Sequence, residues 1–228
     1  MFWNKKNKDI AEECSKLLYL WLSKAVTKNG RIHAEDLISA AAAIAGEISI
    51  EVAGDFNPRQ HSFPPGQRVL SAKANELFSG DKDLIEAPPN SIVGIFRDRL
   101  LAGGFNREDF PPSLKEIFTY FVANIGKAED WGKVPLSVPK DNYPFMMPLQ
   151  VAYESRAAVD KFFAPLAGDN KQKLRAATLT LAKTVCETRD VLDRRVAITL
   201  ALETVNGMSK TAPMTDAAMA KVKAGQKT

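Results

Sequence analysis

Three carboxylates at four-residue spacing are the first feature of the sequence that could carry chemistry. Glu47, Glu51 and Asp55 would share one face of an α-helix, because side chains four residues apart are neighbours on a helix. Divalent cations bind such oxygen ligands, and helix bundles often carry metal sites of this kind. An acidic row also occurs on solvated helix faces, and Asp55 falls past the expected helix end. The sequence therefore leaves two alternatives, a divalent metal site and a solvated surface.

A second acidic group lies in the C-terminal part of the chain. Glu187, Asp190 and Asp193 alternate with arginines, and Asp190 stands four residues before Arg194. An acid placed N-terminal to a base at this spacing forms a favourable helix ion pair. We interpret this group as a salt-bridged helix surface or a contact between subunits.

The two histidines are candidates for acid–base chemistry, because histidine is the usual general base near neutral pH. His33 has a structural explanation as the N-cap of a helix. His61 lies in a predicted loop together with Phe56, Arg59 and Phe63, and loops carry binding and catalytic residues more often than other segments. His61 is therefore the candidate catalytic residue, and these four side chains are candidates for binding a ligand or a partner.

A second predicted loop, residues 127–147, is rich in proline and aromatic residues. Trp131, Tyr143 and Phe145 would serve as buried anchors that hold the loop on a helical core. The alternative is that they line an apolar ligand pocket or a partner groove. The sequence leaves both alternatives open.

Helical periodicity dominates the rest of the chain, since apolar residues recur every three to four positions. The run Ala40–Ala45, followed by Gly46, is small on nearly every side and would let another helix approach closely. Twelve of the 13 prolines lie between Pro58 and Pro165, so the middle of the chain is divided into short helices and loops. The longest expected helices cover residues 9–29, 33–53, 113–125, 148–164 and 169–206, the last of which either bends near 187–195 or projects.

These patterns predict an all-α, single-domain bundle of about seven helices with two long proline-containing loops. The domain covers residues 1–207, in which the helical arms 9–53 and 148–206 frame the shorter helices of 54–147. Residues 208–228 are rich in Ala, Lys and Thr without periodicity, and we expect a flexible tail there.

Composition narrows the class of protein. The net charge of +4 is concentrated near the two ends of the 228-residue chain, whereas a nucleic-acid binder needs clustered positive charge on a folded face. No apolar run approaches the length that would span a bilayer, so we expect neither a nucleic-acid nor a membrane partner. The two cysteines, Cys14 and Cys186, have no partner at metal-ligand spacing and fit a reducing, cytoplasmic compartment.

The lack of a convincing catalytic set favours a non-enzymatic scaffold or partner-binding protein. Self-association through helices, as a homodimer, is the expected interaction, together with a protein partner that the sequence does not identify. Two alternatives stay open. One is a metal-dependent hydrolase that uses Glu47 and Glu51 with His33 or His61, and the other is a carrier of an apolar small ligand. No cofactor is expected apart from the divalent metal of the first alternative.

Overall fold

The computed structural model describes residues 9–124 and 134–225, and its regular structure is almost entirely helical. The prediction of an all-α bundle is confirmed. Among the described residues, no helix is both long enough and apolar enough to cross a membrane.

The α-helices are α1 (Ile10–Ala25), α2 (Ala34–Ala53), α3 (Ala72–Ser79), α4 (Ile92–Ala102), α5 (Leu114–Asn124), α6 (Pro148–Phe163), α7 (Asn170–Thr188), α8 (Arg194–Met208) and α9 (Asp216–Gly225). The remaining elements are the strands β1 (Thr27–Lys28) and β2 (Arg31–Ile32) and the 3-10 turns η1 (Arg107–Asp109), η3 (Lys140–Asn142) and η4 (Ala164–Leu166).

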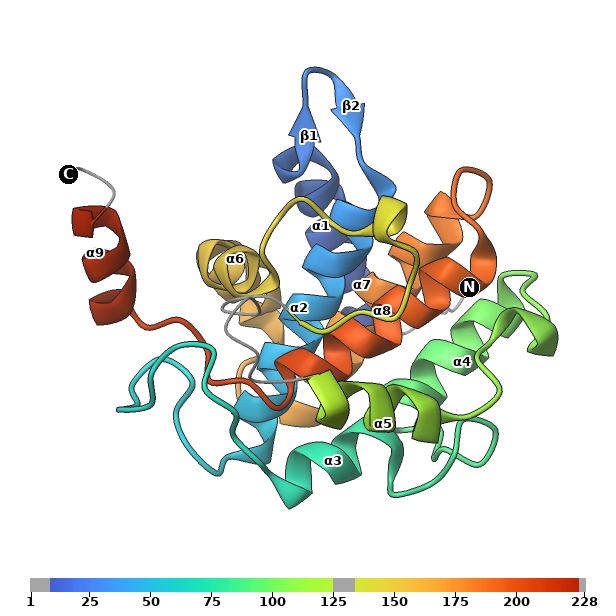
Figure 1. Ribbon diagram of the computed structural model, residues 1–228, viewed down its shortest axis with the longest axis horizontal. Helices are drawn as coiled ribbons and strands as arrows, with labels where there is room; N and C mark the ends of the chain where they lie inside the picture. Colours follow the sequence, from blue (N-terminus) through green and yellow to red (C-terminus); the bar gives the residue numbers. More distant parts are fainter. Residues whose placement is uncertain (1–8, 125–133, 226–228) are drawn as a thin grey trace, which may run out of the picture.

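Helix α2 lies at the centre of the fold (Figure 1). Every residue from Glu35 to Ile50 is buried, and the helix packs against α1, α3, α6, α7 and α8. A Cβ atom added at Gly46 would lie 2.5 Å from Cβ of Met208 in α8, so glycine is required at this crossing. The small surface of α2 thus admits a second helix at close range, as its sequence predicts.

The expected long helix over 169–206 is two helices, α7 and α8, which meet at a sharp turn. The carboxylate of Asp193 accepts a hydrogen bond from the backbone N–H of Val196 at 3.0 Å and caps α8. The predicted ion pair between Asp190 and Arg194 is wrong, because Arg194 instead pairs with Asp109 at 3.5 Å. The chain bends back at this turn, so both helices pack against α2.

Helix α1 ends earlier than its periodicity predicts, and the following residues form a hairpin. Strands β1 and β2 pair in antiparallel fashion, and the turn residues Asn29 and Gly30 have φ values of 51° and 73°. Two successive positive φ values are typical of the tight turn that an Asn-Gly pair favours. The helix predicted to reach Asn29 is therefore shorter, and Gly30 belongs to a turn rather than to a helix cap.

The segment that follows α8 is part of the core. Residues 209–214 are buried, although the sequence places them in a flexible tail. The backbone N–H of Val69 donates to the carbonyl of Lys210 at 2.8 Å, and that of Ala212 donates to the carbonyl of Gln67 at 2.7 Å. The prediction of a flexible tail from residue 208 is thus wrong for 209–214. Beyond this segment the chain continues as α9, whose Asp216 accepts a hydrogen bond from the hydroxyl of Tyr153 in α6 at 2.8 Å (Figure 1).

We predict that Gly46→Ala lowers the free energy of unfolding by about 1–3 kcal/mol, because the added methyl group must push α8 away from α2. Equilibrium denaturation in urea measures this change. Lys16→Ala, at an exposed position of α1, is the control and should stay within about 0.5 kcal/mol of the parent. A Gly46→Ala protein as stable as the parent would contradict the close crossing.

Candidate functional site

The three carboxylates of the predicted metal row do not converge on one point. Each one pairs with a cation from another segment: Glu47 with Arg156 at 2.6 Å, Glu51 with Lys173 at 3.1 Å, and Asp55 with Lys73 at 3.4 Å. Within residues 9–124 and 134–225, no three His, Cys, Asp or Glu side chains are placed to hold a metal ion. The structure therefore gives no support to the metal alternative at Glu47, Glu51 and Asp55.

The alternative of a solvated acidic face is also wrong for Glu47, which is only 8% exposed. Burial raises the pKa of this carboxyl, and the neighbouring Arg156 opposes that rise. The guanidinium of Arg156 also donates to the backbone carbonyl of Pro58 at 3.4 Å. This buried ion pair thus joins α2 and α6 and holds the start of the loop that follows α2.

The aromatic loop after α2 gathers three of its four predicted site residues. The rings of Phe56, His61 and Phe63 contact one another, with centroids 5.4 to 5.7 Å apart. Nε2 of His61 lies 3.1 Å from the carbonyl oxygen of Pro213, and it must donate there because a carbonyl only accepts. Arg59 instead makes a two-pronged ion pair with Asp160, at 2.8 and 2.6 Å. These contacts anchor the loop on its neighbours.

The aromatic residues of the second loop lie apart from the first cluster. Phe145 is 77% exposed and stacks on His33 with centroids 4.4 Å apart. The hydroxyl of Tyr143 donates to the carbonyl of Leu136 at 2.7 Å. Trp131 lies outside the described residues. The six described residues that were predicted to bind a ligand or a partner are therefore not gathered in one cluster.

A different residue, Lys210, combines burial with unused hydrogen-bonding capacity. It follows the C-terminal end of α8 and is only 7% exposed. Its Nζ lies 4.5 Å from the ring centroid of Phe118, 5.7 Å from that of Phe121 and 5.9 Å from that of Phe78. Aromatic faces attract a cation, so these rings partly replace the water that the ammonium group has lost.

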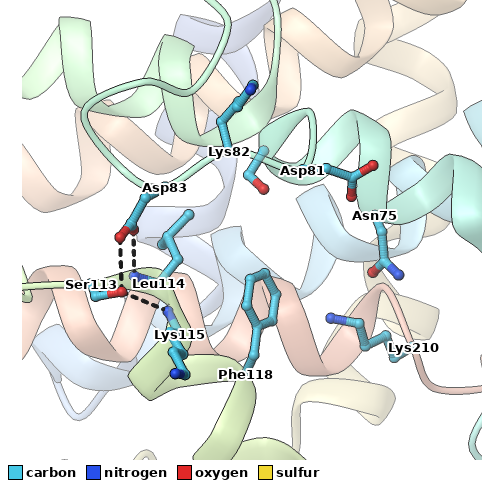
Figure 2. Close-up of a pocket in the computed structure, with 10 residues that line it drawn as sticks. Asn75, Asp81, Lys82, Asp83, Ser113, Leu114, Lys115, Phe118 and Lys210 are labelled. Carbon is cyan, nitrogen blue, oxygen red and sulfur yellow. Dashed lines mark hydrogen bonds between the residues drawn. The ribbon is translucent and has the colours of Figure 1, made fainter.

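Lys210 lines a cavity of about 410 Å³ between α3, α5 and the segment after α8. Figure 2 shows its amine directed into the space beside Phe118 and Asn75, with Asp81 on the far side. The cavity is lined by Asn75, Ser79, Asp81, Lys82, Asp83, Ser113, Leu114, Lys115, Phe118 and Lys210.

One wall of the cavity is fixed by Asp83, which caps α5. Its carboxylate accepts hydrogen bonds from Ser113 Oγ and from the backbone N–H of Leu114, both at 2.8 Å (Figure 2). Ser113 also caps the helix locally, because its Oγ accepts a hydrogen bond from the backbone N–H of Lys115 at 3.0 Å, so the carboxylate from a distant segment shares the capping role. Asp83 is therefore committed to the helix terminus, where a negative charge is favourable.

The environment of Lys210 disfavours its charged form. Desolvation, reinforced by the positive charge of Arg68, lowers the pKa of Lys210 to about 8. The ammonium donates to Oδ1 of Asn206, and no carboxylate of the described chain forms an ion pair with it. Nδ2 of Asn206 is buried without a hydrogen-bond partner. Nζ of Lys210 thus has donor capacity that a ligand in the cavity could satisfy, whereas Asn206 is not part of the cavity lining.

A larger cavity of about 820 Å³ lies on the other side of Asp83, but its main cations are already occupied. Arg97 donates to the backbone carbonyls of Leu84, Ile85 and Ala87, and Arg195 donates to that of Glu108. Because these guanidinium groups hold loops in place, the Lys210 cavity is the stronger candidate site.

Sequence reasoning missed Lys210, because the segment around it has no helical periodicity. A usable signal was present in the apolar residues Met208, Ala212 and Met214, which flank this lysine and are unusual for a solvated tail. The lysine also stands four residues after Asn206, which is the spacing of neighbours on a helix.

Comparisons of the chain with known protein families, with curated proteins and with solved structures find no match. The candidate site therefore rests on its geometry and its electrostatics.

We predict that Arg156→Met destabilises the protein by about 3–5 kcal/mol at neutral pH, because Glu47 would keep a buried charge without a partner. Urea denaturation should show this loss. It should also show partial recovery as the pH falls, since burial favours the protonated form of Glu47 in the folded state.

The double variant Glu47→Gln/Arg156→Met is the matched control, because neither buried charge remains. It should regain much of the stability lost by Arg156→Met. Equal stability of Arg156→Met and the parent protein would show that the ion pair has no such role.

Proposed function

We propose that the protein binds a small organic anion in the cavity beside Lys210. The observation that carries this proposal is that a buried ammonium group faces the cavity without a carboxylate partner among the described residues. A buried charge without a counter-ion is costly, and a bound anion would supply the missing charge. This proposal differs from the predicted carrier of an apolar small ligand, because the ligand is an anion and the site lies at the end of α8 instead of in the aromatic loops.

The charges around the cavity support an anionic ligand. Lys82 and Lys115 are exposed at its edge, and Lys210 lies at its base. Of the two acids in the lining, Asp83 is engaged by the N-terminus of α5, so Asp81 is the main opposing charge. The volume of about 410 Å³ lies in the usual range for small-molecule sites. Phe118 and Leu114 would contact the apolar part of such a ligand.

The test is a titration of the full chain with lactate, succinate and inorganic phosphate, followed by calorimetry or NMR. At least one of these anions should bind, and Lys210→Met should weaken that binding about tenfold or more. Affinity should fall as the pH rises through about 8, because the ammonium form of Lys210 is then lost.

Lys161→Met, on α6 and outside the cavity lining, is the control variant and should bind as the parent does. Binding of none of the three anions, or equal binding to Lys210→Met in a folded state, would overturn the proposal.

We also infer a second function, self-association through the outer face of α1. Ile10, Leu17 and Leu20 are 52%, 49% and 55% exposed, although they are apolar. Together with the exposed Glu13 and Lys24, they lie at positions 10, 13, 17, 20 and 24. Successive members of this row are therefore three or four residues apart in alternation. This spacing is typical of a helix seam that packs against another helix. The apolar residues of α1 are thus divided between a buried row and this exposed row.

The seam is self-complementary when a second copy packs in the antiparallel direction. A two-fold axis between positions 18 and 19 would place Leu17 beside Leu20 of the second copy. The same axis would place Glu13 beside Lys24 of the second copy, so opposite charges would meet. Two-fold dimers need a surface that complements itself in this way.

Sedimentation equilibrium tests the dimer. The parent protein should be dimeric at micromolar concentration, and Leu17→Glu should be monomeric because it puts a charge at the seam centre. Val122→Glu changes an exposed valine on α5 and should leave the dimer intact. A monomeric parent, or a dimer unaffected by Leu17→Glu, would refute this interface.

A cytoplasmic location is part of the same proposal. Its support is that Cys14 and Cys186 are free thiols, which persist in reducing compartments.

A further inference from the structure

The surroundings of Lys210 meet two independent conditions for a nucleophilic amine. Burial removes most of the water from Nζ, since Lys210 is only 7% exposed, and the cation of Arg68 acts on the same group. An amine becomes a nucleophile when an apolar environment or a neighbouring cation favours its neutral form. With the pKa of Lys210 near 8, roughly a tenth of the amine is neutral at pH 7.

We propose that Nζ of Lys210 forms an imine with the carbonyl carbon of a small 2-oxo acid bound in this cavity. The inference rests on the proposed anion binding, because the carboxylate of the 2-oxo acid is the group that the exposed lysines would attract. It assigns a reactive role to Lys210 that anion binding alone does not require.

The step balances without an added oxidant or reductant. The lone pair of the neutral amine attacks the carbonyl carbon, and a C–N bond forms while the carbonyl oxygen takes up a proton. The resulting carbinolamine loses its hydroxyl group as water, and the nitrogen loses its two protons in the overall change. The products are one imine and one water molecule.

Polar groups that could transfer protons line the cavity across from Lys210. Asn75 and Asp81 face the open space above Lys210 in Figure 2, and Ser79 is also part of the lining. Asp81 is exposed, so it has access to solvent protons when the hydroxyl group leaves. The charged groups around the amine are Arg68 on the segment paired with Thr211, Asp81, Lys82 and Asp83 after α3, and Lys115 on α5.

The experiment traps the imine in the full chain with pyruvate and sodium cyanoborohydride, followed by intact mass and peptide mapping. One reduced adduct at Lys210 is expected. The rate of trapping should rise as the pH approaches about 8 and fall at higher pH, because the neutral amine is the nucleophile while anion binding and the reducible protonated imine are lost as the pH rises. Trapping spread evenly over the exposed lysines would overturn the inference.

Lys210→Arg separates the two proposals, since a guanidinium keeps the positive charge but does not form this imine. This variant should still bind lactate while losing the adduct. Lys161→Arg, on α6 and outside the cavity lining, is the matched control and should keep the adduct at Lys210. Circular dichroism and a thermal melt confirm that each variant is folded.

If lactate binds to the parent but pyruvate gives no adduct at Lys210, imine formation is refuted and anion binding stands. If none of lactate, succinate, inorganic phosphate and pyruvate binds, both proposals fail. The pH profile of the parent protein provides a test that depends on no variant.

Discussion

The close contact between α2 and α8 is the constraint on which the rest of the structure depends. Gly46 leaves no side chain between the two helices, and the Cβ of Met208 fills the space. Tight packing of this kind makes core positions sensitive to the addition of one methyl group. Because α2 is buried along nearly its whole length, five other helices take their positions from it. The end of α8, and with it the cavity residues, is placed by the same contact.

The candidate site follows from how α8 ends. The chain leaves the helix at Ser209 and immediately pairs with residues 66–69, so the backbone of the next residues stays inside the protein. Lys210 is therefore held against the α5 rings instead of reaching water. A lysine on a surface helix would extend into solvent and keep its ordinary charge. The unusual electrostatics thus arise from backbone pairing and not from a local sequence motif.

Features set by neighbouring residues could be predicted, and features set by distant partners could not. The helix starts at Ser71 and Asp169 are set by local capping, since both side chains accept a hydrogen bond from the backbone N–H three residues further along. The hairpin at Asn29 and Gly30 was also a local signal, but helical periodicity obscured it. The burial of Lys210 depends on segments that are far away in the sequence. Hydrophobic periodicity describes only neighbouring residues, so it does not predict such pairings. The ion pairs of Glu47, Glu51 and Asp55 could not be predicted for the same reason, because their cationic partners lie on other helices.

The buried pair of Glu47 and Arg156 has a consequence for how this protein can diverge among species. A substitution that removes only one of the two charges leaves the other charge buried without a partner. Such a single variant is strongly destabilised. The two positions are therefore bound to change together, from an ion pair directly to a neutral pair. Related chains, when aligned, should carry either both charges or neither, and this covariation would mark α2 and α6 as neighbours without any coordinates.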